Sequence, residues 1–334
     1  MIEPVAVALG DPAGIGAEIT AKAYAERQVR GLPCFFAVGS RRALETSWHG
    51  PVETITAPSQ AREVCDHALP LIEVEHREEI IPGEPTLEGA RCALDALEFA
   101  TGLVRSGAAG ALVTAPISKA QLIAIGFTHP GQTEFVAERC GVASQNVAMM
   151  LLGPTLKCVP VTMHTSIASV PELLTVDLIV GRITATARGL MKNFGIEHPR
   201  IAVAGLNPHA GESGLMGVEE ENIIRPAMEM LAHEDFTLVG PLPADTMFHP
   251  RARAKYDAAV CMYHDQALIP VKTLHFDEGV NLTLGLPIVR TSPDHGTAFD
   301  IAGKNLARPD AMVAALQVAA DCAERRMRAR EECH

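Results

Sequence analysis

The chain has 334 residues, of which 48% are hydrophobic and 20% are charged, a composition typical of a globular protein long enough for two domains. Its formal net charge is −12, which argues against nucleic acid as a partner because a phosphate backbone is bound by a basic surface. Any site for a phosphate group is therefore expected to be a small basic cluster within an acidic protein.

The cysteine pattern and the hydropathy indicate a cytoplasmic protein. Eight cysteines are scattered along the chain without a Cys-x-x-Cys pair, which favours reduced thiols over disulfides. Residues 1–9 are too short for the apolar core of a signal peptide, and no apolar run approaches the roughly 20 residues of a membrane span. We therefore expect no membrane partner.

The N-terminal third alternates between predicted strands and helices. The glycine-rich turn at 10–18 leads from the first strand into a helix, and it suits either a plain tight turn or a loop that binds an anion. Lys119, after a later strand, suits either a cleft or a solvated surface. The alternation predicts an open, mostly parallel sheet. Strands are predicted at 5–9, 34–38 and 111–114, and a helix at 86–105.

The rest of the chain adds a hairpin and two long helices. Gln132 and Thr133 open a helix after a loop, where they suit either a phosphate site or an ordinary helix cap. Strands at 147–152 and 156–162 form a predicted hairpin, which suggests a second subdomain. Further strands are predicted at 201–206, 258–262, 280–284 and 286–289, and helices at 172–194 and from Pro309 onward.

Three histidines, His164, His209 and His264, each follow a predicted strand closely. Strand ends from distant parts of a sequence meet at one edge of a parallel sheet, and three imidazoles with an open position form a catalytic site for zinc or a similar divalent ion. A single strand-end histidine is more often an ordinary surface or core residue. The pattern therefore leaves a metal site and a structural role open.

Two cations, Lys272 and Arg290, interrupt apolar segments. A cation in a buried segment is costly without an anion, so the expected partner is a substrate phosphate or carboxylate, or else a nearby aspartate. The segment from Asp294 to Asp300 suits an adenine and a ribose, with Asp300 accepting a hydrogen bond from a ribose hydroxyl.

A series of motifs runs along nearly the whole chain: GDPAGIG at 10–16, TAPISK at 114–119, GQTE at 131–134, GLNPHAGE at 205–212, GPLPADT at 240–246, MYHDQ at 262–266, NLTLGLP at 281–287 and RTSPDHGT at 290–297. In this order the motifs resemble those of the 4-hydroxythreonine-4-phosphate dehydrogenases of pyridoxal-phosphate biosynthesis. The family pattern has histidine where this chain has Gln132, which can donate a hydrogen bond to phosphate but carries no charge.

The resemblance implies a two-domain α/β/α fold like that of isopropylmalate dehydrogenase, with a mostly parallel sheet. The active site is expected in the interdomain cleft at a homodimer interface. We predict a terminal domain from residues 1–128 and 290–334. The central domain, residues 129–289, is expected to hold the metal ligands and the dimer interface.

The resemblance also implies ligands. One divalent metal, zinc or alternatively cobalt, magnesium or manganese, is expected on His164 and His209 of one subunit and His264 of the other. NAD is the implied oxidant, because residues 295–304 also resemble the adenosine-binding loop of isocitrate and isopropylmalate dehydrogenases. The expected NAD ligands are Gly14, His295, Gly296, Thr297 and Asp300. The expected substrate ligands are Gln132, Thr133, Lys272, Asn281 and Arg290.

The implied reaction is the oxidation of 4-phosphooxy-L-threonine at C3, followed by decarboxylation to 3-amino-2-oxopropyl phosphate. Asp245 or Asp265 is the expected base, or orients a ligand of the metal. The nearest alternative is a paralogue that oxidises 4-phospho-D-threonate or 4-phospho-D-erythronate in sugar-acid catabolism. A more distant alternative is a metal-free protein like the phosphotransacetylases.

Overall fold

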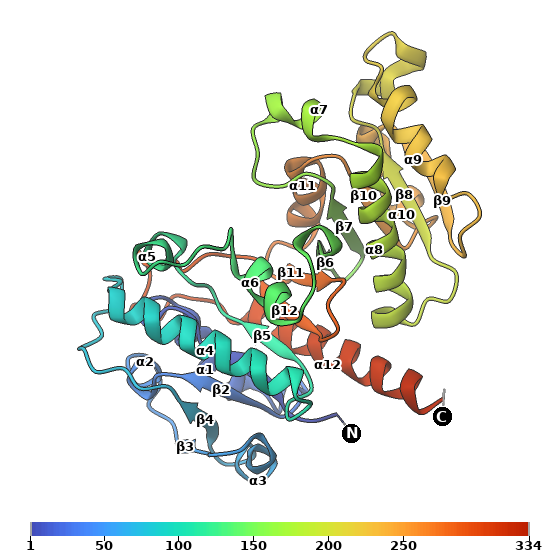
Figure 1. Cartoon of the computed structure of the whole chain (residues 1–334). Coiled ribbons are helices and arrows are strands. Elements are labelled where there is room, and N and C mark those ends of the chain that lie inside the picture. Colours follow the sequence, from blue (N-terminus) through green and yellow to red (C-terminus); the bar gives the residue numbers. More distant parts are fainter. Residues whose placement is uncertain (1, 333–334) are drawn as a thin grey trace. The chain divides into compact units, whose positions relative to one another are not determined.

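A computed structural model describes residues 2–332. The chain divides into two compact units, one made of Met1–Gly141 and Leu286–His334 and the other of Val142–Gly285. Each unit has a central sheet with helices on both of its faces (Figure 1). The predicted α/β class with a mostly parallel sheet is confirmed.

The sheet of the first unit is fully parallel and has the strand order β3-β4-β2-β1-β5-β12. Its three central strands β2, β1 and β5 are buried along their whole length, as expected for apolar strands that are covered on both faces. The strands are β1 (Val5–Ala8), β2 (Phe35–Gly39), β3 (Val52–Thr54), β4 (Leu69–Glu73), β5 (Leu112–Thr114) and β12 (Arg290–Pro293).

Helices cover both faces of this sheet. α4 (Leu87–Arg105) packs on β1, β2 and β5, while α1 (Gly16–Glu26) packs against α12 (Asp310–Glu331) on the other side. The Thr86 hydroxyl begins α4 by accepting a hydrogen bond from the Gly89 amide at 3.0 Å. Shorter helices are α2 (Arg41–Glu45), α3 (Ala61–Val64), α5 (Lys119–Ala124) and α6 (Gln132–Arg139), with a 3₁₀ turn η1 (Pro58–Gln60).

The sheet of the second unit is mixed and has the order β11-β6-β7-β10-β8-β9. β7, β10, β8 and β9 run parallel, whereas β6 is antiparallel to both of its neighbours. The predicted hairpin is therefore confirmed as β6 and β7. The strands are β6 (Ala148–Gly153), β7 (Leu156–Pro160), β8 (Arg200–Ala204), β9 (Thr237–Leu242), β10 (Ala258–Cys261) and β11 (Val280–Leu284).

In the second unit α8 (Val176–Phe194) and α9 (Arg225–Met230) pack together on one face of the sheet, and α11 (His264–Leu274) packs on the other. The predicted helix over 172–194 is two helices, because Thr175 adopts an extended backbone and caps α8 by accepting from the Leu178 amide at 3.2 Å. The remaining elements are α7 (Val170–Leu173), α10 (Pro250–Arg253), and the short turns η2 (Ser144–Asn146), η3 (Ile167–Ser169), η4 (Pro208–Gly214), η5 (Glu220–Ile224) and η6 (Ala244–Thr246).

The structure assigns residues 129–141 to the first unit, whereas the predicted boundary lies at 128/129. The reason is the packing of α6: the Phe127 and Phe135 ring centroids lie 5.6 Å apart, and Arg139 forms an ion pair with Glu98 at 2.7 Å. The other boundary lies after Gly285.

The predicted strand at 286–289 is wrong: β12 begins at Arg290, where its pairing with Leu112 starts. Pro287, inside the predicted run, lacks the N–H that a ladder needs. Within residues 2–332 no helix is both long and apolar enough to cross a membrane. The cysteines in that range carry free thiols, and Cys333 lies outside it.

Candidate functional site

A buried guanidinium lies at the edge of the first unit's sheet. Arg290 is only 5% exposed, and its Nη2 donates to the Thr114 hydroxyl at 2.7 Å while Nη1 donates to the Thr133 hydroxyl at 3.1 Å. Burial lowers the pKa of Arg290 to about 10, against the opposing effect of the Glu134 carboxylate. The side chain therefore remains cationic at neutral pH, in surroundings where an anion gains most from it.

Gln132 lies beside this guanidinium cluster at the first position of α6. Its Nε2 donates to the Ala115 carbonyl at 3.3 Å. This bond fixes the orientation of the amide, because a flipped amide would place Oε1 against the carbonyl oxygen of Ala115. The Oε1 atom is buried, and it has no hydrogen-bond partner among the described residues. The structure thus brings together three predicted substrate ligands, Gln132, Thr133 and Arg290.

A glycine turn after β1 lies against the loop that follows β12. Gly10 has a left-handed φ of +72°, and a Cβ there would lie 2.3 Å from the Pro116 carbonyl oxygen. The Ile15 amide donates to the Thr297 carbonyl at 3.1 Å. A Cβ on Gly14 would approach the same oxygen to 3.1 Å. Two of the predicted NAD ligands, Gly14 and Thr297, are therefore in contact.

The same turn buries a carboxylate. Asp11 is 1% exposed; its Oδ1 accepts from the Ala13 amide at 3.1 Å, and Oδ2 has no partner within the described chain. Burial raises the pKa of Asp11, and backbone hydrogen bonds from Ala13 and Ser118 oppose this rise. A glycine cradle beside an unsatisfied polar atom fits a polar ligand such as a dinucleotide. The other predicted NAD ligands are exposed: His295, Gly296 and Asp300.

In the second unit, two predicted metal ligands lie side by side. The ring centroids of His164 and His264 are 5.5 Å apart. The Nδ1 of His264 is 2.7 Å from the Asp265 carboxylate, an arrangement that leaves Nε2 for another ligand. Among residues 2–332, no group of three or more His, Cys, Asp or Glu side chains is placed to hold a metal ion. The site formed with His209 stays a prediction.

His209 lies in an unusual turn after β8. Residues 209–213 all have left-handed φ values, between +42° and +78°, and His164 has a φ of +46°. This conformation costs a non-glycine residue roughly 1–2 kcal/mol. Such a turn persists only where its surroundings hold it.

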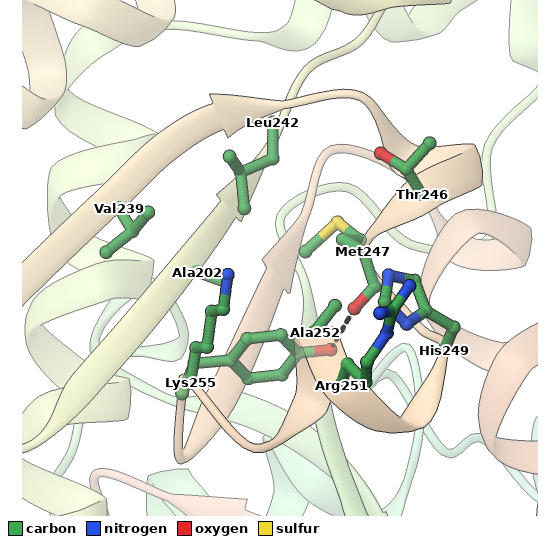
Figure 2. A pocket seen from close by; sticks show the side chains of 10 residues that line it. Ala202, Val239, Leu242, Thr246, Met247, His249, Arg251, Ala252 and Lys255 are labelled. Carbon is green, nitrogen blue, oxygen red and sulfur yellow. Dashed lines mark hydrogen bonds between the residues drawn. The ribbon is translucent and has the colours of Figure 1, made fainter.

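The other predicted residues of this unit lie on separate elements. Asp245 is exposed in η6, and Lys272 and Asn281 lie on α11 and β11. The segment after Asp245 borders a cavity of about 550 Å³ in which the Tyr256 hydroxyl donates to the Met247 carbonyl at 2.8 Å. Figure 2 shows the lining, which includes the basic residues His249, Arg251 and Lys255.

Comparison with known proteins identifies the family. The model of the pyridoxal phosphate biosynthetic protein PdxA matches residues 32–319. This chain belongs to the PdxA family. It is 54% identical to a 4-hydroxythreonine-4-phosphate dehydrogenase of Zymomonas mobilis over 97% of both chains, and 52% identical to one of Erythrobacter litoralis, also over 97% of each. The solved structure of the Klebsiella pneumoniae 4-hydroxythreonine-4-phosphate dehydrogenase is similar with a TM-score of 0.87 and 36% identity, covering 97% of this chain and 98% of that one.

Two buried polar side chains connect the strand-end loops of this PdxA-family chain, and neither was among the predicted site residues. Gln266 donates to the Gly205 carbonyl and accepts from the Met262 amide, both at 2.7 Å, and so links the ends of β8 and β10. Glu220 is 1% exposed and bonds to the loop that carries His209. Gln266 lies two residues after the predicted ligand His264, whereas Glu220 is one of three consecutive glutamates and has no such signal.

Proposed function

We propose that the chain is a 4-hydroxythreonine-4-phosphate dehydrogenase. It oxidises 4-phosphooxy-L-threonine at C3 with NAD and releases carbon dioxide, which yields 3-amino-2-oxopropyl phosphate for pyridoxal phosphate synthesis. Membership of the PdxA family supports the reaction, and the relatives that match over nearly the whole chain carry this name.

The buried Arg290 is the structural observation that carries the proposal. The guanidinium is 5% exposed, donates to the hydroxyls of Thr133 and Thr114, and is the kind of buried cation that a phosphate binds strongly. Thr133, at the start of α6, adds a hydroxyl and the free amides of a helix N-terminus, which suit a phosphate. Lys272 and Asn281 are the further proposed substrate ligands.

His164, His209 and His264 are the proposed metal ligands in an assembled homodimer. Imidazole nitrogens suit zinc, and in the proposed dimer one subunit would contribute His164 and His209 while the other contributes His264. When bound, a divalent metal supplies Lewis acidity that favours ionisation of the substrate hydroxyl and stabilises the enolate left by decarboxylation. Asp265 fixes the ring of His264 through Nδ1.

The side chains and loops of the chain would supply the base and hold the hydride acceptor. Asp245 or Asp265 would take the proton of the C3 hydroxyl, and bound NAD would supply the acceptor for the C3 hydride. The oxidised product is a β-keto acid, whose carboxylate leaves as carbon dioxide with the electron pair retained at C2. Gly14 and Thr297 would hold NAD, and exposed Asp300 would accept from its ribose hydroxyl.

NADH formation by the purified, zinc-loaded protein tests this function. 4-Phosphooxy-L-threonine and 4-phospho-D-threonate are supplied in parallel, each with a chelator control. We expect chelator-sensitive turnover that prefers the amino acid. Preference for the sugar acid would move the enzyme to catabolism, and turnover that resists the chelator would remove the metal from the proposal.

A further inference from the structure

Glu220 places a buried carboxylate under the loop that carries His209. It is 1% exposed. Its Oε1 accepts from the backbone amides of Leu206 at 2.8 Å and of Asn207 at 2.7 Å. Its Oε2 accepts from Nδ2 of the Asn207 side chain at 2.9 Å. The negative charge is thus stabilised by N–H donors of the segment that enters the left-handed turn.

The neighbouring glycines leave room for this carboxylate. A Cβ on Gly205 would lie 3.0 Å from Oε1 of Glu220, and one on Gly211 would lie 2.6 Å from Oε2. On Gly217 a Cβ would meet Nδ2 of Asn207 at 2.2 Å. Gly205 and Gly211 therefore let the backbone close around the Glu220 carboxylate, and Gly217 leaves room for the Asn207 side chain that bonds to it.

The fixed backbone ends two residues before His209. The Asn207 carbonyl accepts from the Ala210 amide at 3.1 Å, so the residue that Glu220 holds also closes the turn around His209. The φ of His209 is +54°, a conformation that an L-residue seldom keeps without support. Loss of the Glu220 carboxylate would free the backbone amides of Leu206 and Asn207 and let the turn relax, while the Asn207 side chain would keep its bond to Glu219 at 2.7 Å.

We infer that Glu220 is a positioning residue that orients His209 for metal binding. This inference rests on the proposed function, because His209 is a metal ligand only there. A group that acts through a ligand changes metal affinity by typically 10–100-fold when it is altered. A group that only stabilises the unit changes the affinity whether or not His209 is present.

The test measures zinc affinity by competition with a chromophoric chelator, using the full chain. In Glu220→Gln the side chain keeps its size but places an N–H₂ group toward Asn207, and we expect about a 10–100-fold loss of affinity. Glu221→Gln is the matched control, because the Glu221 carboxylate pairs with Arg225 at 3.0 Å on the surface, where 46% of each side chain is exposed. The control should bind zinc as the wild type does.

Epistasis separates positioning from general stability. If Glu220 acts through His209, adding Glu220→Gln to His209→Ala causes no further loss of affinity. Added to His164→Ala, the same change causes its full loss. Equal losses in both backgrounds would show a merely structural role and overturn the inference.

Hydrogen exchange gives a readout that does not depend on metal. In metal-free Glu220→Gln, amides in the peptide covering residues 205–214 should exchange faster, while those of β10 remain protected. If this variant does not fold, Glu220→Asp replaces it, since the shorter carboxylate keeps the charge but withdraws from the amides. Unchanged exchange in 205–214 in the folded variant would overturn the inference.

The two proposals fail in different ways. If His209→Ala leaves the zinc affinity of the wild type unchanged, the ligand set of the proposed function is wrong and the inference falls with it. If His209→Ala weakens zinc binding but Glu220→Gln binds zinc as tightly as the wild type, only the inference is wrong.

Discussion

The two units hold their candidate ligands in opposite ways. In the first, Arg290 lies on the strand β12, is buried, and donates to the hydroxyls of Thr114 and Thr133. In the second, His164 and His209 are exposed on strand-end loops and have left-handed φ values. The anion site of the first unit therefore depends on a buried charge. The proposed metal ligands of the second unit depend on the conformation of their loops.

This difference indicates which residues should tolerate change. A buried cation exerts its effect through charge, so removing it should weaken the binding of an anion and leave other steps largely intact. A histidine on a loop acts by holding the proposed metal in the right place. Its removal should therefore affect every step of the reaction that needs the metal. Variants of His209 and of Arg290 should therefore differ in which kinetic constant they change.

The largest expected effect is that of His209→Ala. Removal of one of three proposed metal ligands should lower kcat by at least about 10³-fold while the circular dichroism spectrum stays native. The left-handed strain at this position falls on alanine as well, so stability should change little. His233→Ala, on the exposed end of the same unit, is the control and should keep full activity. Full activity of His209→Ala would remove this residue from the site.

A second variant, Arg290→Ala, tests the buried charge. Charge-assisted hydrogen bonds contribute about 1.5–3 kcal/mol each, so KM for the phosphorylated substrate should rise about 10²-fold, with a smaller change in KM for NAD. Steady-state kinetics with each substrate varied in turn measures this split.

Arg326 provides a matched control for that variant. It is also buried, at 7% exposure, and burial likewise lowers its pKa to about 10. However, its Nη1 donates to the carbonyls of Leu286 at 3.4 Å and Pro287 at 3.0 Å. Arg326→Ala should therefore lower the midpoint of thermal unfolding and leave both KM values unchanged. If the two variants raise KM equally, the Arg290 effect is one of folding.

Much of the fold was predictable from local pattern. Apolar runs marked most strands of the parallel core, and the strand at 280–284 has the predicted bounds. The segment after Tyr263 was harder: residues 264–274 form α11 with Pro270 inside it. A proline and a short apolar run conceal the helical period, and only packing on β6, β7 and β10 makes the helix favourable.

The sequence indicated which side chains belong to the site, but not the backbone conformation and buried contacts that hold them in place. Arg290 was recognisable because a cation stood out in an apolar segment. The turn at 209–213 was not, because four of its five residues are not glycine and give no local signal for a left-handed backbone. Glu220 looks like one acid among three in sequence, and only its burial distinguishes it.

The smallest expected effect is that of Gln132→His, which adds a titratable charge beside the buried cation. A histidine with a pKa near its ordinary value of about 6.5 is cationic at pH 6 and neutral at pH 8. A charge-assisted bond is roughly twice as strong as a neutral one, so KM for the phosphorylated substrate should be roughly 5-fold lower than in the wild type at pH 6 and similar at pH 8. The ratio of the two enzymes at each pH cancels the titration of the substrate phosphate itself.

Gln317→His is the control for this pH dependence, because Gln317 also donates an amide hydrogen bond to a carbonyl, that of Arg30 at 3.1 Å, but on the exposed surface. It should show the wild-type KM at both pH values. If Gln132→His shows a KM ratio of one at pH 6, position 132 does not contact the phosphate. Its hydrogen bond to Ala115 then serves only to close α6 onto β5, and the anion site is that of Arg290 and Thr133 alone.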